Sequence, residues 1–147
     1  MKSQLTILMS IRPRFAERIL KGIKKFELRR YIFPIPERSR IIVYASSPIK
    51  AIIGEFEAGR VFKASPETVW QFVNTFPDSG IEDEDWKYIK GARYALAIEV
   101  VNPVYYEEPI PLEVIRKYIP FFAPPMSYQI VRPGTPLAQL LRHLIKR

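Results

Sequence analysis

The residues best suited to chemistry lie together in the segment LKGIKKFELRR, residues 20–30. Arg29 offers a planar fork of donors that suits a phosphate or a base edge, and Lys24 offers a point charge that also suits phosphate. Glu27 cannot bind phosphate, but its carboxylate can accept from a base amino group or hold one of the two cations. The segment therefore predicts either a site for an anionic ligand or a set of ion pairs.

Alternation in this segment places Glu27 and Arg29 on one face of an expected strand, while Phe26 and Leu28 face the core. A cleft would use both polar side chains for a ligand. An exposed strand face would instead pair Glu27 with Arg29 or Lys25, for at most about 1 kcal/mol. The alternation by itself fits both interpretations.

A helix over residues 12–22 is expected to precede the strand. Pro13 suits a first helical turn, and Gly22 suits a helix end. Basic side chains recur at helical spacing and form a cationic edge, which we expect to contact phosphates. This basic edge consists of Arg14, Arg18, Lys21 and Lys25.

The net charge of +8 is concentrated in the first third of the chain. Residues 1–50 hold 12 Lys and Arg against three Asp and Glu, whereas residues 51–100 hold five against nine. A localised basic surface favours an anionic partner, with nucleic acid first. A surface that serves solubility, or that of a thermophile, is the alternative interpretation.

Composition excludes several classes of site. The chain has no cysteine and one histidine, His143, so disulfides, thiol nucleophiles and thiolate metal sites are excluded and no zinc pattern is visible. His143 is expected to be exposed near the end of a basic helix. No apolar run approaches the roughly 20 residues that span a membrane, and the first residues do not resemble a signal peptide. We expect a soluble, cytoplasmic protein without metal or cofactor.

Further candidates follow the expected third strand. Tyr44 would stack on a base at a barrel mouth, but its alternation with Ile42 fits core burial equally well. Ser46 and Ser47 can donate to phosphate, although Ser-Ser-Pro is also an ordinary turn. Weaker candidates on the closing strand are Ser127 and Tyr128.

Apolar periodicity and turn residues predict an irregular order of strands and helices. Strands are expected at residues 5–11, 24–30, 40–46, 50–62, 92–106 and 124–131, and helices at 12–22, 65–76, 81–91, 111–119 and 135–147. Gly54 and Gly59 are placed to bend the fourth strand, and the acidic run 82–85 is interpreted as charge at a helix start. Because helices and strands do not alternate regularly, we predict an α+β fold around a compact mixed barrel.

The spacing of Gly22, Lys24, Glu27 and Arg29 matches G-x-K-x-x-E-x-R, a pattern of ASCH domains, which the sequence resembles over about residues 5–132. The segments LTILMSIRPRFAERIL, IIVYASSPIKAIIGEFEAG and PMSYQIV look like strands and the first helix of that family. The resemblance implies one PUA-like domain over residues 1–147. Its fold would be a mixed barrel of five to six strands with helices capping the rim. A basic helix at residues 136–147 lies outside the resemblance.

The resemblance also implies RNA binding, linked to regulation of transcription or translation, in a cleft between the first helix and the barrel. Lys24, Glu27, Arg29 and Tyr44 would line this pocket. The partner is expected to be single-stranded or structured RNA, and neither a membrane nor an oligomer is predicted.

Some proteins of similar fold are amidohydrolases of modified cytidine, and others are ribonucleases. In the amidohydrolases the signature lysine works with a threonine three positions on and with a later glutamate. Lys24 matches the lysine, but Glu27 occupies the threonine position and no residue near 78–82 clearly matches the glutamate. Binding is therefore predicted, with no catalytic residue assigned. The alternative is a small metal-independent hydrolase of modified nucleosides or RNA that uses Lys24 and Glu27.

Overall fold

The structure is a computed structural model that describes residues 4–31 and 33–146. Its six strands form one sheet in the order β2-β5-β4-β3-β1-β6. The strands are β1 (Thr6–Ile11), β2 (Phe26–Arg30), β3 (Arg40–Ala45), β4 (Ala51–Ala64), β5 (Ala95–Pro111) and β6 (Tyr128–Ile130). The helices are α1 (Pro13–Leu20), α2 (Pro66–Asn74), α3 (Asp83–Ile89), α4 (Leu112–Tyr118) and α5 (Pro136–Leu144).

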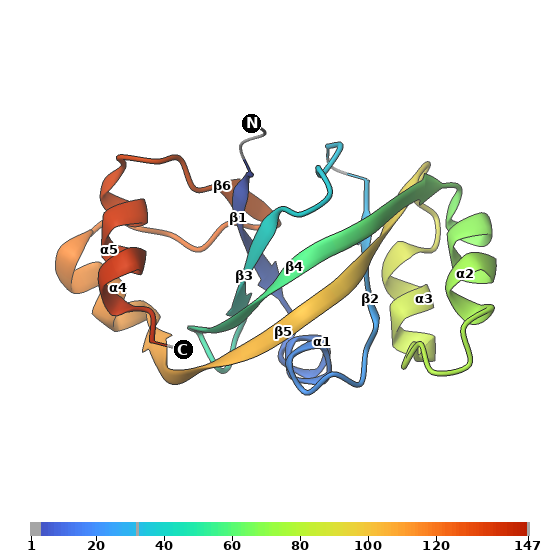
Figure 1. The fold of residues 1–147 in the computed structure, drawn as a ribbon, viewed down its shortest axis with the longest axis horizontal. Coiled ribbons are helices and arrows are strands. Elements are labelled where there is room, and N and C mark those ends of the chain that lie inside the picture. The colour runs from blue at the N-terminus through green and yellow to red at the C-terminus, as the bar shows by residue number, and fades with distance from the viewer. Residues whose placement is uncertain (1–3, 32, 147) are drawn as a thin grey trace.

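The sheet is strongly curled, with helices gathered at both ends (Figure 1). The long strands β4 and β5 run the length of the molecule, with α2 and α3 at one end and α4 and α5 at the other (Figure 1). Strands β1 and β3 are parallel, and the other neighbours are antiparallel. The predicted α+β barrel-like fold is confirmed, and β2 and β6 form the two edges of the sheet.

Three apolar clusters support this arrangement. The first lies between the sheet and α1 and includes Met9, Ile19 and Val43. The second packs β1 and β3 against α4 and α5, and the third packs Phe26 and Leu28 of β2 against α2 and α3. Successive residues of a strand therefore serve different clusters, as a sheet covered on both faces requires.

Several local predictions are confirmed. The hydroxyls of Ser65 and Thr135 cap α2 and α5, each by accepting from the backbone N–H three residues on, at 3.2 Å.

Strand β5 continues five residues beyond the predicted position 106, because β4 pairs with its far end through Ala51 and Ile52. No helix in the described ranges is long and apolar enough to cross a membrane.

Gly54 allows β4 to bend between its neighbours. The register of β4 shifts at this residue against both β3 and β5. A Cβ at position 54 would lie 2.3 Å from the carbonyl oxygen of Val104 and 2.7 Å from a methyl carbon of Leu20. The bulge therefore brings α1 and β5 closer to β4 than any side chain would allow.

We expect Gly54→Ala to lower the free energy of unfolding by roughly 2 kcal/mol or more, since overpacking usually costs 1–3 kcal/mol and a backbone carbonyl must move here. Gly59→Ala is the matched control, because the nearest obstacle at that position is the end of the Glu99 side chain. Urea unfolding of both variants measures the difference. An equal loss in the two variants would contradict this account of the bend.

Candidate functional site

Gly22 reverses the direction of the chain after α1. The residues that follow it in the G-x-K-x-x-E-x-R pattern therefore turn toward the interior. It has a positive φ of 78°, and the backbone N–H groups of Ile23 and Lys24 both donate to the carbonyl of Arg18. Glycine adopts this left-handed conformation without the cost that a Cβ would bring. The reversal leads directly into β2 with Lys24 pointing into the molecule.

Lys24 is completely buried and held by three oxygen atoms. Its Nζ lies 2.7 Å from Oδ1 of Asp85 and 3.5 Å from Oε1 of Glu27, and it donates to the carbonyl of Phe26 at 2.6 Å. The ring of Phe15 lies 5.2 Å from the ammonium group. A buried ammonium needs such partners to offset its lost hydration. Lys24 therefore lies beneath the site as a structural cation, without the solvent access that a direct phosphate contact needs.

The loop between α2 and α3 covers the chain segment that carries Lys24. The N–H of Lys25 donates to the carbonyl of Ser79 at 2.8 Å. Gly80 follows with a φ of 71°, and a Cβ there would lie 2.1 Å from the carbonyl oxygen of Ile23. The loop thus crosses directly over the backbone that precedes Lys24, and only glycine fits at the crossing.

Asp85 was not predicted as a site residue, yet it is the nearest carboxylate to Lys24. The acidic run was interpreted as charge at a helix start, and Asp85 does accept from the N–H of Glu82 at 2.9 Å. Its other oxygen pairs with Lys24, and only 2% of the residue is exposed. The available signal was its spacing: Asp85 lies four residues before buried Ile89, so both lie on the inner face of α3.

Glu27 and Arg29 lie on one strand face, as predicted, and both are buried. Nη1 of Arg29 lies 3.1 Å from Oε2 of Glu27. Glu27 and Arg29 therefore do form an ion pair, but the pair is buried and not exposed as the alternative interpretation required. The other alternative partner, Lys25, donates to the carbonyl of Gly22 instead.

Arg29 also joins the two edges of the sheet. From β2 its guanidinium donates to the carbonyl of Ser10 on β1 at 3.0 Å. It donates to both the carbonyl and the hydroxyl of Ser127, just before β6, at 3.2 and 2.8 Å. We call this set of contacts the arginine clasp. It replaces, with side-chain donors, the backbone ladder that β2 and β6 do not form.

A cleft of about 280 Å³ opens above Glu27 and Arg29. Its rim carries an exposed cation, a half-buried aromatic ring and an exposed thioether, namely Arg12, Tyr88 and Met126. The guanidiniums of Arg12 and Arg29 lie 5.5 and 5.8 Å from the centre of the Tyr88 ring. The remaining lining residues are Ser10, Ile11, Phe15 and Ser46.

The structure brings only some of the predicted residues to this cleft. Glu27, Arg29 and Ser46 line it, whereas Ser47 lies in the exposed turn that follows β3. Tyr44 points to the opposite face of the sheet, into the cluster under α4 and α5, and burial there raises the pKa of its hydroxyl. Core packing is thus the alternative that the geometry favours for Tyr44.

The basic edge of α1 is partly neutralised. Nε of Arg14 donates to Glu82 at 2.9 Å, and Arg18 lies 3.6 Å from the same carboxylate. The hydrogen bond from Arg14 lowers the pKa of Glu82, so this carboxylate stays charged at neutral pH. Lys21 is exposed, and no ion pair holds it in the described part of the chain. The described residues contain no group of His, Asp and Glu that could hold a metal ion.

We expect Asp85→Asn to lower the free energy of unfolding by roughly 3 kcal/mol, because it leaves Lys24 buried with one distant carboxylate. Asp83→Asn is the matched control: Asp83 is exposed on the same helix and should change stability by about 0.5 kcal/mol or less. Urea unfolding at neutral pH compares the two. Similar stability of both variants would show that the pair with Lys24 is dispensable.

Comparison with known proteins agrees with this geometry. No family model matches the sequence. An ASCH domain-containing ribonuclease of Zymomonas mobilis is 29% identical over 128 residues, which cover 84% of this chain and 82% of the relative. The crystal structure of an ASCH protein from Zymomonas mobilis superposes with a TM-score of 0.83 at 25% identity, covering 97% of this chain and 96% of that one.

A more distant solved structure shares the fold alone. The N-terminal domain of Staphylothermus marinus McrB gives a TM-score of 0.55 at 15% identity, over 97% of this chain and 98% of that one. Three observations point to the same family. They are the G-x-K-x-x-E-x-R pattern, the curled sheet and the similarity to the Zymomonas relative. The chain is thus similar to ASCH domain proteins in its sequence pattern and in its fold.

Proposed function

We propose that this chain binds RNA, with a base or nucleotide in the cleft and phosphates on the exposed cations beside it. One observation carries the proposal: two polar atoms in the floor of the cleft form no hydrogen bond with the described residues. They are Nε of Arg29 and Oε1 of Glu27, and the second also lies 3.5 Å from the ammonium of Lys24 in an ion pair. A neighbouring donor and acceptor are what a base edge requires.

The rim supplies the other two contacts that single-stranded RNA uses. Tyr88 offers a ring on which a base can stack, and the guanidinium of Arg12 lies beside it. Arg12 and Lys21 are exposed and form no ion pair within the described ranges, so both remain available to phosphates. The basic composition of residues 1–50 supports the same class of partner.

The Zymomonas relative adds independent support, because its name describes a ribonuclease. That protein must bind RNA in order to act on it. The shared fold and the length over which the sequences match support the same partner class for this chain. A role in regulating transcription or translation remains a proposal on the family resemblance alone.

We expect Arg12→Gln and Tyr88→Leu each to weaken RNA binding, the first by a lost phosphate contact and the second by a lost stacking platform worth about 1–3 kcal/mol per base. Fluorescence anisotropy with single-stranded and hairpin RNA at several salt concentrations measures both effects. Arg12→Gln should also flatten the plot of log affinity against log salt by about 0.7 per lost contact for single strands.

Arg93→Gln is the matched control for charge, because Arg93 is exposed and does not line the cleft. Circular dichroism confirms that each variant is folded. Wild-type affinity in both Arg12→Gln and Tyr88→Leu would contradict binding at this cleft, even if the protein binds RNA elsewhere.

Hydrolysis of RNA is a second candidate, favoured by the name of the relative. Glu27 is the carboxylate that lines the cleft, and Lys24 lies 3.5 Å from it. A hydrolase should release product from labelled RNA or acylated cytidine and fall to background in Glu27→Gln, which keeps the size of the side chain but removes its charge. If the wild type makes no more product than Glu27→Gln, this candidate is wrong.

A further inference from the structure

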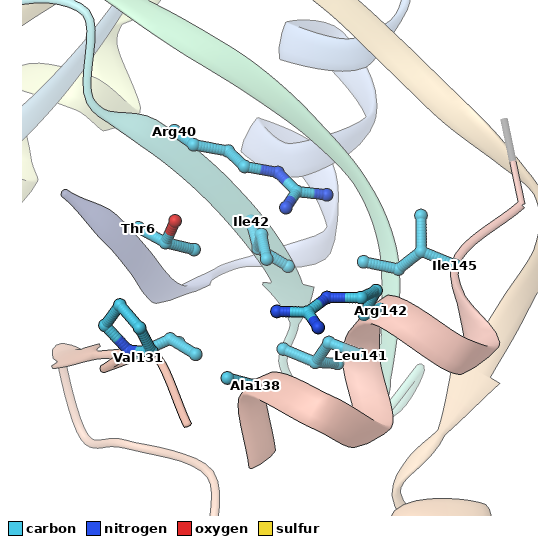
Figure 2. A pocket seen from close by; sticks show the side chains of 9 residues that line it. Thr6, Arg40, Ile42, Val131, Ala138, Leu141, Arg142 and Ile145 are labelled. Atoms are coloured by element: carbon cyan, nitrogen blue, oxygen red, sulfur yellow. The ribbon is translucent and has the colours of Figure 1, made fainter. Parts of the chain in front are cut away.

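A second cavity, of about 400 Å³, lies on the other side of the sheet, between α5 and the strands β1 and β3 (Figure 2). Ile42 and Leu141 form part of its wall and belong to the apolar cluster under α4 and α5. The cleft shares no lining residue with this cavity. Its size falls within the range of pockets that hold small ligands.

One end of the cavity carries a preorganised arginine. Nε and Nη2 of Arg40 lie 3.1 and 2.7 Å from Oε1 of Glu55. Glu55 also accepts from the hydroxyl of Tyr106 at 2.6 Å, and burial together with this bond raises the pKa of Tyr106. The carboxylate thus holds one edge of the Arg40 guanidinium still. Nη1, on the other edge, makes neither of these bonds to Glu55, and the Arg40 side chain lines the cavity (Figure 2).

A second arginine approaches from the helix. Arg142 lies in the last turn of α5, is exposed, and makes no hydrogen bond or ion pair within the described part of the chain. Figure 2 shows its guanidinium turned back over Leu141 and toward Ile42. The side chain thus lies along the cavity, on the same side as the guanidinium of Arg40. Two cations and one carboxylate leave a positive excess there, which a bound anion would offset.

The rest of the lining favours a ligand with an apolar or planar body. Ile42, Leu141 and Ile145 offer aliphatic surface, and Thr6 adds one hydroxyl (Figure 2). A phosphate monoester carries a charge of about −1.5 to −2 at neutral pH and three acceptor oxygens, so it can use both guanidiniums at once. Arginine forks match phosphate geometry, and a planar base can lie on aliphatic walls or on a guanidinium face.

We propose that this cavity binds a nucleoside monophosphate, with the phosphate between Arg40 and Arg142 and the base against the aliphatic wall. The same chemistry is present in a free mononucleotide and in the 5′-phosphorylated end of an RNA. The site is separate from the cleft and does not depend on RNA binding there.

Isothermal titration calorimetry with adenosine 5′-monophosphate, adenosine and inorganic phosphate tests the site. We expect the monophosphate to bind at least tenfold more tightly than either fragment. Arg142→Gln should weaken it at least tenfold, whereas Arg93→Gln, with the same change in charge far from the cavity, should not. Arg142 is exposed, so its replacement leaves the fold intact.

Ala138→Leu provides a second variant that keeps both arginines but fills part of the cavity, because Ala138 lines it from α5. It should also weaken the monophosphate at least tenfold. Arg142→Gln should bind a 5′-hydroxyl RNA as the wild type does, so failure at one site is distinguishable from failure at the other. Equal binding of adenosine and its monophosphate, or unchanged binding in both Arg142→Gln and Ala138→Leu, would overturn the proposal.

Two short RNAs identify the source of the ligand, one with a 5′-phosphate and one with a 5′-hydroxyl. Preference for the phosphorylated RNA that disappears in Arg142→Gln assigns the site to an RNA end. Binding of the free monophosphate without that preference assigns it to a free nucleotide. If neither phosphorylated probe binds, the proposal is wrong.

Discussion

The fold depends on a few charges that the molecule buries. Lys24, Glu27, Arg29 and Asp85 come from the turn after α1, from β2 and from α3, and each is at most 3% exposed. Burial removes their hydration, so every member must find its partner before the structure is favourable. The partners add directional contacts to the apolar packing: Asp85 of α3 holds the turn before β2 through Lys24, and Arg29 holds the two sheet edges against each other. A buried ion pair seldom adds net stability. It can still favour one fold over others, because in any other arrangement its charges would be buried without partners.

Much of the architecture was predictable because it rests on local chemistry. The helix starts depend on the capping hydroxyls of Ser65 and Thr135. The bend at Gly54 depends on the absence of a Cβ, and the reversal at Gly22 on a left-handed backbone conformation. The shared face of Glu27 and Arg29 followed from alternation. Their burial did not, because it depends on α1, α3 and the segment before β6 covering that face.

The missed parts of the site share one cause. Arg12, Tyr88 and Met126 come from three separate segments and meet only when the sheet curls. Tyr44 illustrates the converse, since alternation left its direction open and the cover supplied by α4 and α5 decides it. The pairing of Asp85 with Lys24 was not predicted, because a carboxylate in the first turn of a helix is already favourable there without a distant partner. When a residue already has a local role, such as helix capping, the sequence gives no additional signal for a contact with a residue far along the chain.

The arginine clasp also has a consequence for folding kinetics. It joins Arg29 to Ser127, 98 positions apart, whereas the long β4–β5 pairing connects strands closer together along the chain. A contact across so long a stretch is costly to close early, so we expect the clasp to form late in folding. Interactions that form after the rate-limiting step leave the folding rate almost unchanged and slow unfolding instead. We therefore expect the buried Arg29 to affect the unfolding rate more than the folding rate.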